Sequence, residues 1–139
     1  MNFHYIVRGI IRDGVHILLC KQKDGNHTFL LGGHIEFGEG AKAALAREIK
    51  EEIGADVTIV KFRGAIENAW EDHCEISLVF DVEHNLSKDV TPVPASPEEE
   101  HLAFVWVHQD DLKLHNLLPT PLIDWLKDAS HCNWATTID

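Results

Sequence analysis

Three glutamates, Glu48, Glu51 and Glu52, are the residues of this chain whose types and spacing most clearly indicate chemistry. On a helix, the spacing i, i+3, i+4 brings their carboxylates to neighbouring positions. Like charges that close repel each other, so the cluster lowers stability unless a cation or a partner binds there. The glycines Gly32 and Gly33 lie shortly upstream and let a ligand approach the backbone closely. Together these features predict a magnesium-carrying phosphate site.

The phase of the predicted helix separates this cluster from an ordinary solvated acidic face. At about 100° per residue the helix has one apolar stripe, formed by Ala41, Leu45, Ile49 and Ile53. Glu52 falls inside that stripe, Glu48 flanks it, and Glu51 lies one step further round. Burying a lone carboxylate is costly, so Glu52 needs a metal, an arginine or a wet cleft. For Glu51 a solvated position remains an open alternative.

The ends of this helix are also marked in the sequence. Gly40 and the alanine-rich segment after it favour a start near residue 40, with Glu39 at the positive end of the helix dipole. Gly54 is a natural stop, because glycine readily adopts the left-handed conformation that closes a helix. Before the helix, the segment 29–31 is typical of a short buried strand that leads into the paired glycines.

Residues 33 to 55 resemble the signature box of the Nudix hydrolases. That box is a glycine, five residues, a glutamate, seven residues, and then Arg-Glu-apolar-x-Glu-Glu-x-Gly-apolar. Its fixed positions are occupied here by Gly33, Glu39, Arg47, Glu48, Ile49, Glu51, Glu52, Gly54 and Ala55. All polar and glycine positions match, while Ala55 is a small apolar residue and Leu31 stands where many members carry proline. Length and composition predict one domain over residues 1–139, and the resemblance implies an α/β/α sandwich with the box helix packed on a mixed sheet.

Hydrophobic patterning in the rest of the chain predicts a mixed order of strands and helices. Strands are expected over residues 4–12, 15–21, 56–67, 74–83 and 102–107. Asp13 and Gly14 form the turn signal of a hairpin. The polar, proline-containing segment 84–100 is predicted to be an exposed loop, and a final helix is expected over residues 121–129.

Hydrolysis of a phosphoanhydride needs a polarised phosphorus, an activated water and compensation of charge on the leaving phosphate. Hard oxygen ligands select Mg²⁺ or Mn²⁺. The predicted ligands are Glu48 and Glu52 directly, Glu51 on the same or a second ion, and the carbonyl of Gly32 or Gly33, a pair that the resemblance favours without deciding between them. Arg47 points away from the apolar stripe and is expected to orient the carboxylates, with Glu39 as its partner.

The general base is open between several residues. In some Nudix relatives a glutamate of the box helix accepts the proton, and in others a glutamate from a distant loop does. Glu98, Glu99 and Glu100 occupy such a loop here, although a run of glutamates after a proline is also typical of a solvated segment. Glu75 is a second candidate, for which a surface acid at a strand edge is the favoured interpretation. His73 is a further candidate acid or base, and the alternative is an isolated surface histidine in a loop.

The substrate class follows from the resemblance more than from single residues. Trp70 is predicted to begin a loop that includes His73, where its ring could stack on a nucleobase, with a core or rim tryptophan as the alternative. A nucleoside triphosphate pyrophosphohydrolase is the main hypothesis. Hydrolysis of a nucleotide sugar or a dinucleoside polyphosphate is the alternative. A non-catalytic nucleotide sensor is disfavoured because every charged position of the box is retained.

Composition limits the partners of the protein. The net charge of −11 over 139 residues disfavours nucleic acid and anionic membrane surfaces and predicts metal dependence for any phosphate substrate. The sequence has no apolar stretch of about 18 residues and no secretory signal. Three cysteines, odd in number and far apart, favour a reducing cytoplasm. Four tryptophans and the apolar segment around Trp134 are compatible with either a homodimer or one completed core.

Overall fold

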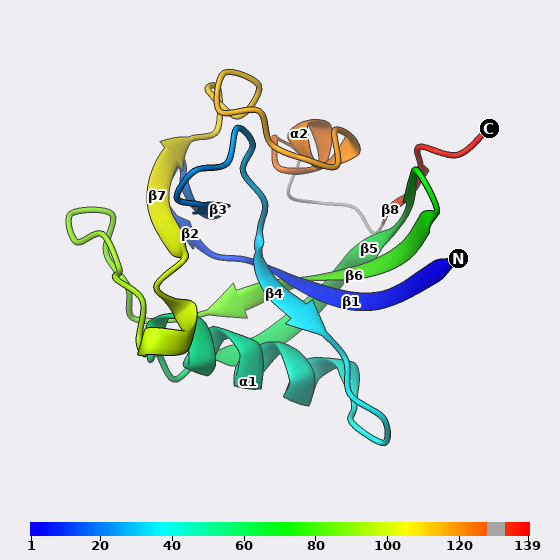
Figure 1. Cartoon of the computed structure of the whole chain (residues 1–139). Helices are drawn as coiled ribbons and strands as arrows, with labels where there is room; N and C mark the ends of the chain where they lie inside the picture. Colours follow the sequence, from blue (N-terminus) through cyan, green and yellow to red (C-terminus); the bar gives the residue numbers. More distant parts are fainter. Residues whose placement is uncertain (128–132) are drawn as a thin grey trace.

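A mixed sheet with the strand order β4-β1-β6-β5-β8 forms the centre of the computed structural model, which describes residues 1–127 and 133–139 (Figure 1). Its strands are β1 (Asn2–Ile10), β4 (Leu31–His34), β5 (Thr58–Trp70), β6 (His73–Glu83) and β8 (Asn133–Thr136). β1 is antiparallel to β4 and parallel to β6, whereas β5 is antiparallel to β6 and parallel to β8. A smaller antiparallel sheet has the order β2-β3-β7, with β2 (Arg12–Asp13), β3 (His16–Gln22) and β7 (Leu102–His108).

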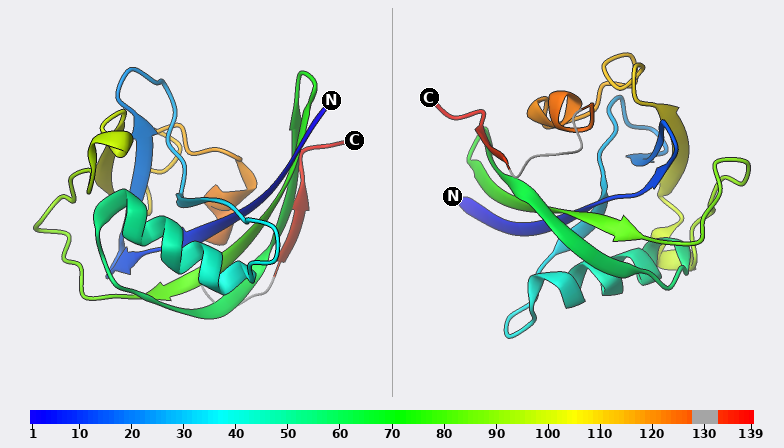
Figure 2. Two further views of the ribbon diagram at one scale, coloured as in Figure 1. Left: turned by 60° about the horizontal axis from the view of Figure 1, so that its bottom comes forward. Right: turned by 180° about the vertical axis from the view of Figure 1, so that it is seen from behind.

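The helices α1 (Ala41–Ile53) and α2 (Pro121–Trp125) lie on opposite sides of the large sheet (Figure 1, Figure 2). Each helix packs on its own group of buried apolar side chains. Strand β3 contributes to both groups, because Leu18 and Cys20 join the α1 group while Ile17 and Leu19 join the α2 group. This alternation follows from the period of two residues in a strand. The predicted sandwich with the box helix packed on a mixed sheet is confirmed.

Helix α1 forms where the sequence predicts it. Its buried residues are Ala44, Leu45, Ile49 and Glu52, so the acid is part of the face that packs on the sheet. Gly54 ends the helix with a φ of 73° and donates its N–H to the Lys50 carbonyl. A left-handed residue at this place is well suited to glycine, which has no Cβ to clash. The predicted ends of the helix agree with the structure to within one residue.

The prediction of one strand over residues 4–12 is wrong, because the chain leaves the large sheet after Ile10 and enters the small one at Arg12. The hairpin turn at Asp13 and Gly14 is present between β2 and β3, but β1 itself pairs with β4 and β6. The local hydrophobic pattern could not indicate these partners, because they are distant in sequence. A strand break at Ile11 carries no glycine or proline that would have marked it.

The paired glycines lie inside β4 instead of following a strand over residues 29–31, so that prediction is also wrong. Gly32 has a φ of 144°, and a Cβ at this position would lie 2.0 Å from the Val7 carbonyl oxygen of β1. Only glycine combines this backbone conformation with so close an approach. Here the glycines let β4 pair with β1, instead of forming a turn.

Strands β5 and β6 form a long hairpin that differs from the prediction at its tip. Trp70 and His73, which were expected to lie in a loop, are the last residues paired across the two strands. Glu75 lies on β6, between β1 and β5, and its residue is only 8% exposed. The interpretation of Glu75 as a surface acid at a strand edge is therefore wrong.

The C-terminal part contains a strand that the sequence pattern did not predict. β8 pairs in parallel with β5, and its Trp134 is 62% exposed, so this tryptophan does not complete the core. The predicted final helix begins at Pro121 as expected and is described to Trp125, whereas Ala129 lies outside the described residues. None of the described helices has the length and apolar character needed to cross a membrane. Cys20 is buried and Cys74 is half-buried, and both are free thiols; Cys132 lies outside the described residues.

Candidate active site

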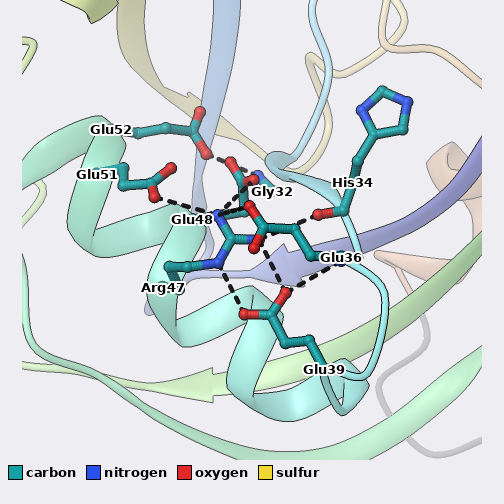
Figure 3. Close-up of polar contacts among 8 residues, drawn as sticks. All are labelled: Gly32, His34, Glu36, Glu39, Arg47, Glu48, Glu51 and Glu52. Carbon is teal, nitrogen blue, oxygen red and sulfur yellow. Dashed lines mark hydrogen bonds and ion pairs between the residues drawn. The ribbon is translucent and has the colours of Figure 1, made fainter.

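Arg47 connects the acidic cluster of α1 to the segment before the helix (Figure 3). Its Nε and Nη2 atoms donate to the two carboxylate oxygens of Glu39, at 2.7 and 2.9 Å. Nη1 donates to Glu48 at 3.0 Å and to Glu51 at 3.1 Å, and Nη2 also donates to the His34 carbonyl at 3.1 Å. A guanidinium has five N–H donors, so these five bonds occupy its full capacity. The pairing of Arg47 with Glu39 that the sequence predicts is present.

These contacts stabilise the charged forms of the residues involved. The hydrogen bonds from Glu39, followed by those from Glu51 and Glu48, raise the pKa of Arg47. In return the Arg47 hydrogen bonds lower the pKa of the Glu39 carboxyl. Two of the three clustered glutamates thus share one cation, which offsets part of their mutual repulsion. The Arg47 side chain therefore sets where the carboxylates of Glu48 and Glu51 point.

Glu52 has no such cation and is the most buried of the three glutamates. Its residue is 4% exposed, its Oε1 accepts the Gly32 N–H at 3.0 Å, and the Cys20 thiol lies 4.0 Å from its Oε2. Burial raises the pKa of Glu52 to about 8, against a lowering by the Gly32 hydrogen bond. The loss of hydration outweighs one backbone donor, so the carboxyl group binds a proton near neutral pH. A bound cation would favour its ionised form.

The environment of Glu48 is intermediate between those of Glu52 and Glu51. Burial raises its pKa, while the hydrogen bond and charge of Arg47 oppose that change. A Cβ at Gly33 would lie 2.6 Å from the Glu48 Cδ atom, so the carboxylate rests directly on the strand backbone. Glu51 is more open, with a side chain 48% exposed. The order of burial, Glu52 before Glu48 before Glu51, agrees with the helical phase.

The chemistry of this donor set fits a hard divalent cation. In the described part of the chain, no three His, Cys, Asp or Glu side chains form a ready-made metal cage. The carboxylates are turned toward Arg47 and the Gly32 amide instead (Figure 3). Mg²⁺ usually retains several waters and takes one or two protein carboxylates, so it needs no closed cage. The Glu52 carboxyl is buried and, among the described residues, is bonded by no basic side chain, so it is the group that such an ion would complement.

The loop before β7 brings one of its glutamates to the cluster. The Ala95 N–H donates to the Glu52 carbonyl at 2.9 Å, which attaches this loop to the end of α1 just before the 3-10 helix η1 (Pro97–Glu99). Within the run 98–100, Glu99 is half-buried and its two neighbours are exposed. The charge of Glu99 is among the causes that raise the pKa values of Glu48 and Glu52. The fold therefore brings Glu99, from a segment distant in sequence, to the acidic residues of α1.

A pocket of about 670 Å³ lies on the face of the large sheet opposite to α1. His4, Ile6 and Arg8 line it from β1, since alternate residues of that strand face away from the helix. Arg8 pairs across the strands with Gly32, whose N–H donates to Glu52, so this end of the pocket adjoins the acidic cluster. The charge of Arg8 also lowers the pKa of Glu52. His34 links the two regions, because its side chain lines the pocket while its carbonyl accepts from Arg47 (Figure 3).

Aromatic rings form the other end of this pocket. Trp70, which is 43% exposed, stacks on His73 with ring centroids 5.0 Å apart and on His4 with centroids 5.8 Å apart. The planes of both ring pairs differ by less than 10°, at 6° and 9°. His73 is therefore part of an aromatic group and not an isolated loop histidine. His4 and Arg8 were not identified from the sequence, although their alternation with Ile6 would have placed all three on one face.

Comparison with known proteins agrees with this architecture. The model of the NUDIX domain family matches residues 2–127. A nucleoside triphosphatase NudI from Salmonella agona is 30% identical over 133 residues, covering 84% of this chain and 90% of that protein. In fold, the chain is similar to the Escherichia coli ORF135 protein, with a TM-score of 0.72 at 24% identity and 96% of both chains covered. It is also similar to a MutT protein from Methanosarcina mazei, with a TM-score of 0.73 at 21% identity and 91% of both chains covered.

Replacing Glu52 by glutamine should raise the free energy of unfolding of the metal-free protein, by an amount that grows with pH. The folded-state pKa of about 8 exceeds the ordinary value of 4.5, so below pH 4.5 both states are protonated and no penalty exists. Above pH 4.5 the unfolded chain loses this proton more readily than the folded one. The free energy of unfolding of the unsubstituted protein therefore falls by up to about 1.4 kcal/mol per pH unit until the pH reaches about 8. Urea unfolding in chelator at pH 5, 6.5 and 8 measures the difference.

The matched control is Glu51→Gln, on the same helix but with a side chain that is 48% exposed. This variant should show no comparable growth with pH, because the Glu51 side chain that it replaces is about half exposed and its carboxylate is paired with Arg47. A constant difference between Glu52→Gln and the unsubstituted protein across the three pH values would contradict the burial argument.

Proposed function

The chain belongs to the Nudix family and is a Nudix hydrolase, and we propose that it converts nucleoside triphosphates to nucleoside monophosphates and pyrophosphate. The observation that carries this proposal is the junction at β4 between an acidic cluster and a pocket with aromatic rings at its far end. Such a pair of sites suits a molecule with a phosphate chain at one end and a flat base at the other. The names of the NudI relatives as nucleoside triphosphatases support the same substrate class.

The dimensions and charges of the pocket support one orientation of the substrate. Arg8 and His4 are four residues apart on β1, which corresponds to about 13 Å at roughly 3.3 Å per residue. The phosphates are expected at the Arg8 end, next to the carboxylates of α1, and the base at the Trp70 end. Stacking on the exposed part of the Trp70 ring would contribute to base binding without strong selectivity.

We infer that the cofactor is Mg²⁺ or Mn²⁺, held by Glu48 and Glu52, with Glu51 on the same or a second ion and the carbonyl of Gly32 or Gly33 as a further donor. A bound divalent cation supplies polarisation of the phosphorus and compensation of charge on the leaving pyrophosphate. The chain contributes the positions of its own groups: Arg47 orients Glu48 and Glu51, and the Gly32 N–H orients Glu52. The net charge of −11 makes a cation at this site necessary for binding a polyphosphate.

We assign the role of general base to Glu99. Its half-buried position and its electrostatic effect on Glu48 and Glu52 support a location next to the attacking water. A base in this role accepts the proton of the water as its oxygen attacks phosphorus. Glu98 and Glu100 are exposed, so they are less suited to this task.

The free thiols and the net charge of the protein bear on its compartment and its partners. The free thiols of Cys20 and Cys74 fit the reducing cytoplasm, where disulfides are rare. The acidic surface disfavours nucleic acid as a partner. A small nucleotide is therefore the proposed ligand.

A substrate panel tests the proposed activity directly. Nucleoside triphosphates, nucleotide sugars and dinucleoside polyphosphates are each assayed for phosphate and pyrophosphate release with Mg²⁺, with Mn²⁺ and with chelator. We expect pyrophosphate release from the triphosphates, its loss in chelator, and a loss of orders of magnitude in kcat for Glu48→Gln and Glu52→Gln. Turnover confined to nucleotide sugars or dinucleoside polyphosphates would replace the triphosphate assignment, and metal binding without any turnover would favour a sensor.

Replacing Glu99 by glutamine should lower kcat by about 10²- to 10⁴-fold, since the amide cannot accept a proton. Glu98→Gln and Glu100→Gln are the matched controls from the same loop and should retain activity within a few-fold. A larger loss in either control than in Glu99→Gln would move the base to that residue.

A further inference from the structure

We propose that Glu75 selects the nucleobase, by accepting two parallel hydrogen bonds from a ring N–H and the adjacent exocyclic amino group of a guanine-type edge. This inference rests on the proposed function, because it names the base of the nucleotide that the pocket would bind. It concerns a residue outside the box and outside the acidic cluster of α1.

Glu75 lies in the floor of the pocket, in the middle of the large sheet. In the strand register it pairs with His4 of β1 on one side and with Asn68 of β5 on the other. Residues that pair directly across strands share one face of the sheet, and all three of these residues line the pocket. Since Glu75 is only 8% exposed, solvation does not explain an acid at this position.

The hydrogen-bonding capacity of this carboxylate is largely unused. Its Oε1 accepts one long hydrogen bond, from the Ser77 hydroxyl at 3.4 Å. Among the described residues, no donor bonds to Oε2 and no basic side chain forms an ion pair with Glu75. The carboxylate of this pocket-lining residue therefore has free acceptor capacity, and a ligand that donates two N–H groups would use it.

The donor pattern of the common bases then decides which one fits. A carboxylate can only accept, so both of its oxygens need donors. Guanine has a ring N–H beside an amino group, and this edge presents two donors side by side. Adenine and cytosine place a ring acceptor beside their amino group, while uracil and thymine place one N–H between two carbonyls. Each of these four edges would set a lone pair against a carboxylate oxygen, and the site would lose binding energy.

The neighbouring groups complement the rest of a guanine base. The Asn68 Oδ1 accepts a hydrogen bond from the Thr137 hydroxyl at 2.5 Å, which leaves the Asn68 amide N–H groups available for a base carbonyl. Trp70 lines the same pocket and is 43% exposed, so part of its ring surface is open for stacking on a base. The negative charge of Glu75 would repel phosphates, so it favours binding of the base at this end and of the phosphates at the Arg8 end.

The first test needs only the unsubstituted protein and measures kcat/KM for GTP, ITP, ATP, CTP and UTP at one metal concentration. Inosine lacks the amino group of guanine and is otherwise the same base. We expect GTP to be preferred over every other substrate, with ITP lower by roughly 10- to 100-fold, the usual effect of leaving a charged acceptor unpaired. Equal values for GTP and ITP would overturn the proposal.

The second test compares Glu75→Gln on β6 with Glu67→Gln, the same change on the neighbouring strand β5 but on the opposite face of the sheet. In Glu75→Gln the amide places an N–H against the guanine edge, so kcat/KM for GTP should fall roughly 10- to 100-fold while the values for ATP and CTP stay within a few-fold. Glu67→Gln should leave the order of substrates unchanged. An unaltered preference for GTP in Glu75→Gln would contradict the assignment.

Binding separates a failure of this inference from a failure of the proposed function. The affinities of GMP and IMP for the unsubstituted protein are measured by calorimetry, which requires no turnover. Tighter binding of GMP with no hydrolysis of any triphosphate would support the role of Glu75 and overturn the proposed activity. Equal binding together with triphosphate hydrolysis would retain the activity and overturn the role of Glu75.

Discussion

The burial of the Glu52 carboxyl group under β4 is the constraint on which the rest of the site depends. The apolar face of α1 carries this acid into the packed interior, where a single backbone donor from Gly32 compensates it only in part. Arg47 compensates Glu48 and Glu51 but not Glu52. The helix thus gives up native-state stability by burying the carboxyl group that we propose as a cation ligand, a compromise that is common at functional sites.

Strand β4 connects the buried carboxyl group on the helix side of the sheet to the pocket on the other side. Its backbone alternates between the two faces, so that Gly33 supports the Glu48 carboxylate on the helix side while the His34 ring lines the pocket on the other. The glycines are what allow this arrangement, because a Cβ at Gly32 would meet β1 and one at Gly33 would meet Glu48. One short strand at the edge of the sheet therefore joins the proposed phosphate site to the proposed base site.

The parts of the site that local sequence determines could be predicted, and the parts that strand pairing determines could not. The phase of α1 and its end at Gly54 follow from spacing within one helix, which is why the relative burial of Glu52, Glu48 and Glu51 agreed with expectation. Glu75 was misjudged because its burial depends on β1 and β5 lying on either side of β6. The same limitation explains the missed strand β8, whose partner β5 is distant in sequence.

The most direct test of this account is to locate Mn²⁺ by its anomalous scattering in crystals grown with the metal. We predict a peak within bonding distance of carboxylate oxygens of Glu48 and Glu52, and no peak at this place in crystals of Glu52→Gln. A Mn²⁺ peak away from these two glutamates, or one that persists unchanged in Glu52→Gln, would contradict the claim that the buried carboxyl group is a cation ligand.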